Sequence, residues 1–206
     1  MIAVVDYGAG NLRSVTNALA ELGYQGSVTR EPECVLRADA VVFPGVGAAG
    51  DTMRSISKSG MAEAIRTRID EGLPLLAVCV GMQVLFSGTE EGGWHECLGI
   101  IPGVVKRLPN GLKVPHIGWN QVTQHISHPV FDGVPNNANF YFVHSYHAYP
   151  ENDVGVAGTT HYGVSMCSVL VMGNLVATQF HPEKSGMLGL KIYANFLKMA
   201  GVHRQG

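Results

Sequence analysis

The hydrophobic residues at the start of the chain change from one spacing to another. An apolar run at 2–5 is followed by a glycine-containing turn and then by Leu12, Val15, Leu19 and Leu22, which recur three or four residues apart. Residues with that spacing share one face of a helix, whereas a short apolar run fits a buried strand. The pattern therefore predicts a strand, a tight turn and a helix.

Two further apolar runs, at 40–43 and 74–78, indicate two more strands. The apolar residues between these runs fit one or two helices: Met53, Ile56, Met61 and Ile65. Short buried strands that alternate with helices are typical of a parallel sheet with helices on both faces. We therefore expect an α/β fold of this kind.

From 98 to 180 the pattern changes to short runs separated by Gly, Pro and Asn, including GVVKRL, KVPHIGWN, NFYFVHSYHAY and NLVATQFHP. We expect strands and hairpins there, followed by a closing helix at 187–199. A chain of 206 residues suits one α/β domain and leaves little room for a second core. The pattern thus predicts a single domain over residues 1–206.

The charge of the chain limits the classes of molecule that it is expected to bind. The formal net charge is −2, and no run of Lys or Arg is longer than two residues, so we expect no binding to nucleic acid or to an anionic membrane surface. The first residues lack the basic segment of a signal peptide, and no apolar stretch approaches the roughly eighteen residues of a membrane-spanning helix. We expect a cytoplasmic protein that acts on a small molecule or a protein partner.

The cysteines and histidines do not have the spacing of metal ligands. The four cysteines lie far apart without a C-x-x-C pair, which predicts free thiols in a reducing compartment. The nine histidines include the pairs at 125 and 128 and at 144 and 147, but neither pair has the H-E-x-x-H pattern. We expect neither a metal nor a cofactor.

The third apolar run leads into Cys79, at the end of a strand where ligands of open α/β sheets bind. A nucleophile at a sharp strand-to-helix turn needs small residues two positions before and after it, because larger side chains collide across the turn. Ala77 and Gly81 meet this requirement. The helix that follows favours a thiolate and leaves the Val80 amide free to bind an oxyanion. A lone buried cysteine is more often a small hydrophobic residue, so a nucleophile needs partners.

A candidate base for Cys79 lies in the stretch QFHPEKS at 179–185. Proline at 182 forces His181 into extended backbone, so that His181 and Glu183 can project from the same side. A carboxylate beside an imidazole holds its tautomer and stabilises its charged form. The two residues therefore form a candidate base and its orienting group.

The loop at 43–47, Phe-Pro-Gly-Val-Gly, follows the second predicted strand. Glycine-rich backbone can approach a substrate closely and turn its N–H groups toward a developing negative charge. Pro and Gly also mark ordinary turns, so this motif alone is weak. Beside the other two motifs, it is a candidate second oxyanion donor.

These three motifs resemble, in their order and spacing, those of the class I, triad-type glutamine amidotransferases, and the resemblance spans essentially the whole chain. It implies a flavodoxin-like open, mostly parallel sheet with extra antiparallel strands in the second half. It also implies that Cys79 attacks the side-chain amide of glutamine, that His181 transfers protons and that Glu183 orients His181. The chain has Ala77 and Val80 where members of the family commonly have Gly and Leu.

The same resemblance assigns the residues around the nucleophile. It places Val46, Gly47 and Val80 in the oxyanion region. It places Gly47, Gln83, His144, Ser145 and Tyr146 in the glutamine pocket. One helical turn separates Gln83 from Cys79, which suits residues on one face of a helix.

Two longer motifs are similar to those of one branch of this family. DYGAGNLRSV at 6–15 and KVPHIGWN at 113–120 look like the glutaminase subunits of imidazole glycerol phosphate synthases, which serve histidine biosynthesis. The likeness implies glutamine as substrate and a heterodimer with a separate (β/α)8-barrel cyclase that receives the ammonia. It suggests Trp119, Tyr141 and Lys184 as interface or gate residues. It also implies slow hydrolysis until a ligand of the cyclase sets the loop around Val46.

Other interpretations remain open at this point. The same chemistry could serve another pathway, as in anthranilate-type or pyridoxal-phosphate-type glutaminases. A non-catalytic flavodoxin-like nucleotide-binding protein would use the glycines at 8 and 10, although Arg13 stands where G-x-G-x-x-G requires its last glycine. A cysteine hydrolase of the intracellular protease type would share the turn at Cys79 but would not account for the motifs at 144–146 and 179–185.

Overall fold

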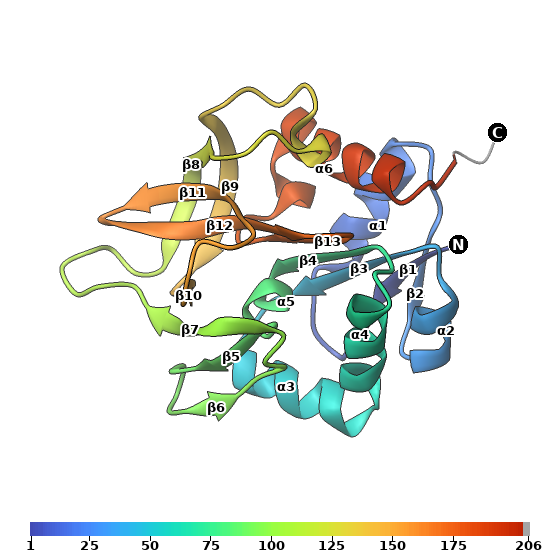
Figure 1. The fold of residues 1–206 in the computed structure, drawn as a ribbon, viewed down its shortest axis with the longest axis horizontal. Helices are drawn as coiled ribbons and strands as arrows, with labels where there is room; N and C mark the ends of the chain where they lie inside the picture. Colours follow the sequence, from blue (N-terminus) through green and yellow to red (C-terminus); the bar gives the residue numbers. More distant parts are fainter. Residues whose placement is uncertain (204–206) are drawn as a thin grey trace.

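The computed structural model describes residues 1–203, and Figure 1 shows their arrangement. The helices are α1 (Leu12–Glu21), α2 (Pro32–Arg37), α3 (Ala49–Lys58), α4 (Met61–Asp70), α5 (Val80–Gln83) and α6 (Gly186–Met199), with short 3-10 turns η1 (Pro129–Phe131) and η2 (Pro182–Lys184). The strands are β1 (Ile2–Val5), β2 (Gly26–Thr29), β3 (Ala40–Gly45), β4 (Leu75–Cys79), β5 (Phe86–Thr89), β6 (His95–Glu96), β7 (Ile101–Arg107), β8 (His116–Gln124), β9 (Ala138–His144), β10 (Tyr146–Pro150), β11 (Val156–Tyr162), β12 (Val164–Met172) and β13 (Leu175–Thr178).

The main sheet has nine strands in the order β2-β1-β3-β4-β13-β12-β11-β8-β9. The strands from β2 to β13 in this order pair in parallel, and the remaining pairs are antiparallel. The parallel half therefore contains the order 2-1-3-4-5 of flavodoxin-like folds. The predicted fold class, an open sheet extended by antiparallel strands, is confirmed.

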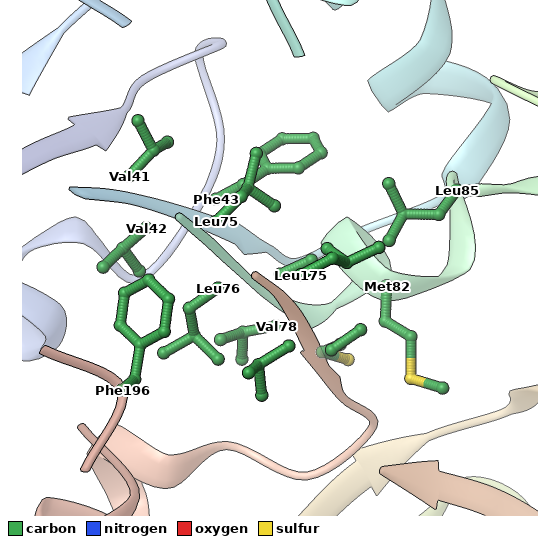
Figure 2. Packing of buried hydrophobic residues seen from close by; sticks show 14 of the residues in the cluster. Val41, Val42, Phe43, Leu75, Leu76, Val78, Met82, Leu85, Leu175 and Phe196 are labelled. Carbon is green, nitrogen blue, oxygen red and sulfur yellow. The ribbon is translucent and has the colours of Figure 1, made fainter. Parts of the chain in front are cut away.

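The centre of the sheet is buried on both faces. In Figure 1, α1 and α6 lie on one side of it, and α2, α3 and α4 lie on the other. All residues of β3 and β4 are buried, as expected for parallel strands covered on both sides. Figure 2 shows Leu76 of β4 and Phe196 of α6 packed in this core. None of the helices in residues 1–203 is long and apolar enough to cross a membrane.

The helix after Cys79 is shorter than the sequence suggests. It has a single turn, α5, and the chain then enters β5 at Phe86. Val84, Leu85 and Phe86 are fully buried, and β5 belongs to a second sheet of four strands in the order β10-β7-β5-β6. The apolar residues after Gln83 therefore start another strand instead of lengthening a helix, and they form a second sheet that was not predicted.

The sequence pattern also misses β2 and α2. Strand β2 lies at the edge of the main sheet and its residues are only partly buried or exposed. Within α2 the one buried residue is Val35. Both elements bury little apolar surface, so they leave little periodic signal in the sequence.

Candidate active site

Three neighbouring parallel strands end at one place in the sheet. Cys79 is the last residue of β4, Val46 follows β3, and His181 comes shortly after β13. Strand β4 pairs with β3 on one side and with β13 on the other. The three motifs recognised in the sequence therefore meet at the carboxyl edge of the sheet, where open α/β folds bind ligands.

Cys79 stands on a strained backbone. Its φ of 55° and ψ of −109° are unusual for a residue with a side chain. A Cβ on Gly81 would lie 2.3 Å from the Phe43 carbonyl oxygen, and one on Gly45 would lie 2.3 Å from the Gly81 nitrogen. Glycine is thus required where the turn packs against β3, as the nucleophile turn predicts. Ala77 is accommodated inside the sheet between β3 and β13.

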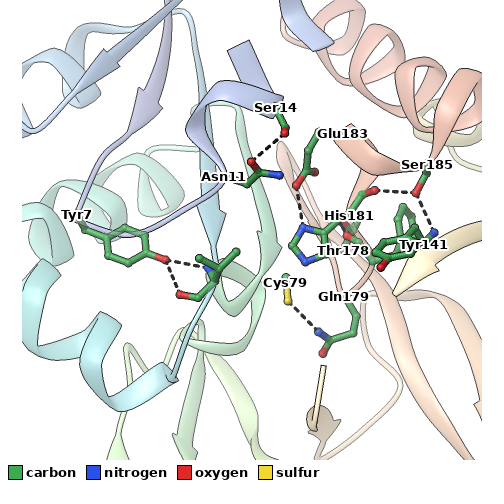
Figure 3. Close-up of polar contacts among 12 residues, drawn as sticks. Tyr7, Asn11, Ser14, Cys79, Tyr141, Thr178, Gln179, His181, Glu183 and Ser185 are labelled. Atoms are coloured by element: carbon green, nitrogen blue, oxygen red, sulfur yellow. Dashed lines mark hydrogen bonds and ion pairs between the residues drawn. The ribbon is translucent and has the colours of Figure 1, made fainter. Parts of the chain in front are cut away.

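His181 lies between Cys79 and Glu183 in Figure 3. Its Nδ1 is 2.8 Å from the Glu183 Oε1, and both side chains are almost fully buried. Burial lowers the pKa of His181, but the charge of Cys79, a hydrogen bond to Cys79 and the contact with Glu183 outweigh it and raise this pKa to about 10. The arrangement therefore favours a charged imidazolium next to the Cys79 sulfur, and a cationic neighbour of this kind activates a cysteine nucleophile.

The other buried cysteines lack such partners. Burial raises the pKa of Cys97 to about 11, and burial together with the charge of Asp153 raises the pKa of Cys167 to about 12. Both groups stay thiols at neutral pH, because their pKa values lie well above 7. All four cysteines of the chain are free, as predicted.

A cavity of about 370 Å³ opens beside Cys79, a size typical of small-molecule sites. It is lined by Val46, Gly47, Cys79, Val80, Gln83, Glu91, Pro115, Val143, His144, Ser145, Tyr146, His181 and Lys184. All residues that the resemblance assigned to the oxyanion region and the glutamine pocket are therefore together in this cavity. Glu183 lies behind His181 and does not line it.

The amide of Gln83 is oriented by two acceptors. Its Nε2 donates to the Tyr146 carbonyl at 2.8 Å and to the Gln179 Oε1 at 3.1 Å. The Nε2 of Gln179 in turn donates to the Cys79 Sγ at 3.6 Å. Since both contacts of Gln83 use its nitrogen, its oxygen remains for a donor of the ligand.

His144 and His116 are two linked neutral imidazoles. The His144 Nδ1 is 2.9 Å from the Tyr146 carbonyl, which can only accept, so this nitrogen carries the proton. The His144 Nε2 must then accept from the His116 Nδ1 at 3.0 Å, and the His116 Nε2 accepts from Asn120 at 3.3 Å. Burial lowers the pKa of His116, and burial, only partly opposed by the bond to Tyr146, lowers the pKa of His144 to about 3.

We expect the free energy of unfolding to fall as the pH is lowered from 7 to 5. Folded His144 stays neutral over this range, whereas the unfolded chain binds a proton there with a pKa near its ordinary value of 6.5. The stability is fully present above that value and is lost as the pH falls toward the folded value. At pH 5 the loss from this one site is about 2 kcal/mol. Urea unfolding at both pH values measures it, and a His144→Asn variant with the same pH dependence would contradict the assignment.

In the oxyanion loop, residues 46–48, the Val46 amide does not have the free position that the sequence predicts for an oxyanion donor. The Val46 N–H donates to the Tyr7 hydroxyl at 3.2 Å, and that hydroxyl is 3.5 Å from the Val46 carbonyl. This amide is therefore already bonded and is not available at the nucleophile. Val80 is the first residue of α5, and the first amides of a helix have no acceptor within it.

Of the three suggested interface residues, Lys184 lines the cavity, and Trp119 and Tyr141 do not. Trp119 is 57% exposed, and its ring meets the Tyr141 ring edge-on with centroids 6.0 Å apart. The Tyr141 carbonyl accepts from the His181 N–H at 2.9 Å. Ile117, on the same side of β8 as Trp119, is also exposed. Ile117 and Trp119 form an exposed apolar face of β8, beside the β9 residue Tyr141 that contacts His181.

Sequence reasoning missed three residues of the site. Glu91 lines the cavity and accepts from the Ala49 N–H at 2.9 Å, Gln179 contacts Cys79, and Tyr7 holds Val46. Gln179 lies in the motif QFHPEKS, two residues before His181, and Tyr7 lies in DYGAGNLRSV, just before the first glycine turn. Their nearness to these features in the sequence was the signal that they belong to the site. Glu91 follows Gln83 by eight residues in a polar turn, and no pattern marks it.

Comparison with known proteins identifies the protein family to which this chain belongs. The family model described as glutamine amidotransferase class-I matches residues 3–200, and the chain belongs to this family. Two solved structures share its fold, one described as the crystal structure of a glutamine amidotransferase (TM-score 0.77, 20% identity, 98% of this chain and 100% of that one) and PurLQS from Thermotoga maritima (TM-score 0.76, 18% identity, 96% and 97%).

Curated relatives narrow the class to one branch. The imidazole glycerol phosphate synthase subunit HisH of Dehalococcoides mccartyi (strain CBDB1) is 56% identical over 200 residues, which cover 97% of this chain and 98% of that protein. The HisH subunit of Herpetosiphon aurantiacus is 50% identical over 200 residues, covering 97% and 95%. Within the class I glutamine amidotransferases, the chain belongs with the HisH subunits.

Proposed function

We propose that this chain is the glutaminase subunit of imidazole glycerol phosphate synthase, and that it hydrolyses glutamine and supplies ammonia to a cyclase subunit in histidine biosynthesis. One observation carries the chemistry. Cys79 stands on a strained turn at the edge of a cavity, beside a buried His181 whose other ring nitrogen is 2.8 Å from Glu183. The membership in the HisH branch supports the pathway.

In the proposed mechanism, the Cys79 thiolate attacks the side-chain amide carbon of glutamine. Protonated His181 gives its proton to the departing nitrogen, so that ammonia leaves and a thioester remains. His181 then takes a proton from water, which attacks the thioester and releases glutamate. Glu183 holds the imidazole and stabilises its charged form throughout. The Val80 amide, joined by the Val46 amide once that group has left Tyr7, stabilises the negative oxygen of both tetrahedral intermediates.

The cavity also offers groups for the amino-acid end of glutamine. Glu91 is the one carboxylate among its lining residues in the described part of the chain, and the free oxygen of Gln83 is a second acceptor. We assign both to the α-ammonium group of glutamine, because an ammonium has three donors and no acceptor.

Replacing Glu91 by glutamine should raise the KM for glutamine about tenfold to a hundredfold, the cost of one hydrogen bond to a charged group, and change kcat much less. The variant keeps an oxygen for the Ala49 N–H. Steady-state kinetics in the complex with the cyclase measure the change. Glu90→Gln is a matched control, because Glu90 is an exposed neighbour in sequence. An unchanged KM in the Glu91 variant would remove Glu91 from the pocket.

We further propose that the partner is a (β/α)8-barrel cyclase that docks on the exposed face of Ile117 and Trp119. Free ammonia would be protonated in water, so its transfer requires a sheltered route between the two sites. The exposed apolar side chains of Ile117 and Trp119 and the position of Lys184 on the cavity support this face as the interface.

A glutaminase assay of the purified chain, alone and with the cyclase and its substrate, tests the function. We expect slow hydrolysis alone and a large increase in the complex, and equal rates would refute the coupling. Rescue of a histidine auxotroph that lacks its own glutaminase subunit tests the pathway. If nucleotides, but not glutamine, raised the melting temperature of the chain, the nucleotide-binding alternative would be favoured.

A further inference from the structure

We propose that Tyr7 is a positioning residue that holds the oxyanion loop in a resting arrangement and so slows glutamine hydrolysis until the cyclase subunit of the complex binds its ligand. The inference rests on the proposed glutaminase function and adds a residue to its regulation. The Tyr7 hydroxyl accepts from the Val46 N–H at 3.2 Å and is 3.5 Å from the Val46 carbonyl. Figure 3 shows these two contacts as the dashed lines that leave Tyr7.

The ring and the backbone of Tyr7 are both held in place. It is 8% exposed, and its ring meets the Phe43 ring edge-on with centroids 5.8 Å apart. The Tyr7 carbonyl accepts a hydrogen bond from the Ser55 hydroxyl of α3. The hydroxyl therefore has a fixed position, from which it binds both polar groups of one residue in the oxyanion loop.

The loop has room to change its arrangement. A cavity of about 240 Å³ lies on the Tyr7 side of the loop and is lined in part by Tyr7, Val46, Gly47 and Thr52. Gly47 has a φ of 90° and no atoms within 4 Å of the place of a Cβ. Glycine adopts either sign of φ readily, so the Val46 peptide can rotate next to it once its bonds to Tyr7 are broken.

The bond to Tyr7 competes with catalysis. An N–H group that donates to Tyr7 cannot also donate to the oxyanion of glutamine, and a lost oxyanion donor typically lowers kcat a hundredfold to a thousandfold. In the resting arrangement Val80 supplies an amide and Val46 does not. Turning the Val46 amide toward the substrate requires the hydrogen bonds to Tyr7 to break, so their strength sets part of the difference between resting and activated rates.

The test is a Tyr7→Phe variant in the complex with the cyclase, which removes the hydroxyl and keeps the ring on Phe43. We expect kcat for glutamine without any cyclase ligand to rise about fivefold to tenfold, the equivalent of one hydrogen bond. With saturating imidazole glycerol phosphate, kcat should stay near the wild-type value, so the activation ratio falls by the same factor. The KM for glutamine should be unchanged, because the hydroxyl does not line the substrate cavity.

Tyr24→Phe is the matched control, since its hydroxyl lies 3.5 Å from the Val202 carbonyl, away from the oxyanion loop. An unstimulated kcat that stays the same in Tyr7→Phe, or falls together with the stimulated kcat, would overturn the proposal. Thermal melting of both variants shows whether a lower rate comes from unfolding, and slower labelling of Cys79 by diazo-oxonorleucine in folded Tyr7→Phe would also overturn it. If wild-type complex neither hydrolysed glutamine nor was labelled at Cys79, the proposed function itself would fail.

Discussion

Replacing Cys79 by serine should lower glutamine hydrolysis by at least about a thousandfold, since loss of the nucleophile leaves only the contribution of binding and oxyanion stabilisation. The hydroxyl of serine is a far weaker nucleophile than a thiolate, and His181 would have to activate it as a general base. The measurement is glutamate release by the complex with the cyclase, at saturating glutamine.

Two controls separate this effect from damage to the fold. The cyclase reaction of the same Cys79→Ser complex should continue when ammonium salts replace glutamine, because the cyclase then receives ammonia without the thioester. Cys34→Ser should keep full activity, since Cys34 is a free, partly exposed cysteine of α2, away from the cavity. Glutamine hydrolysis by Cys79→Ser at a rate close to the wild type would remove Cys79 from the mechanism.

Replacing Glu183 by glutamine should lower kcat by about a hundredfold to ten-thousandfold, the range expected when the group that orients a catalytic histidine loses its charge. Glu183 contributes to the raised pKa of His181, so its neutralisation should lower that pKa. Because His181 must be protonated to release ammonia, the alkaline limit of activity should then move to lower pH. The pH dependence of kcat in the complex measures both effects.

A merely structural role for Glu183 predicts a different result. The variant would lose stability and activity together, without a shift of the alkaline limit in the fraction that remains folded. Glu183→Asp keeps the charge at a shorter reach, so it should retain the shape of the pH profile even if its rate is lower. An alkaline limit that is identical in Glu183→Gln and in the wild type would exclude the proposed electrostatic role.

Those parts of the fold that bury continuous apolar faces could be predicted from the sequence. Strand β1 and helix α1, the fully buried β3 and β4, and the closing helix α6 lie where the hydrophobic spacing indicates. The position of Cys79 followed from the same logic, because a parallel strand that ends in a small-residue turn must present its last side chain at the ligand edge of the sheet.

Other features depend on contacts between segments that are distant in the chain, and no local pattern reveals them. Glu91 reaches the cavity because the second sheet folds back against α3, and its amide partner is Ala49. The bond between Tyr7 and Val46 joins two turns 39 residues apart. The sequence identified Val46 as a candidate donor, but whether its amide faces the substrate depends on a hydroxyl that only the folded chain brings near.

The ring and the peptide groups of Tyr141, in strand β9, make different contacts. The Tyr141 N–H donates to the Ser185 hydroxyl at 3.0 Å, and that hydroxyl donates to the His181 carbonyl at 2.6 Å, while the Tyr141 carbonyl holds the His181 amide. These bonds depend on the peptide groups of residue 141 and not on its ring. Evolution can therefore exchange the ring to suit a different docking surface without disturbing the scaffold of the proton-transfer residue, whereas a proline at this position would sever one of the tethers.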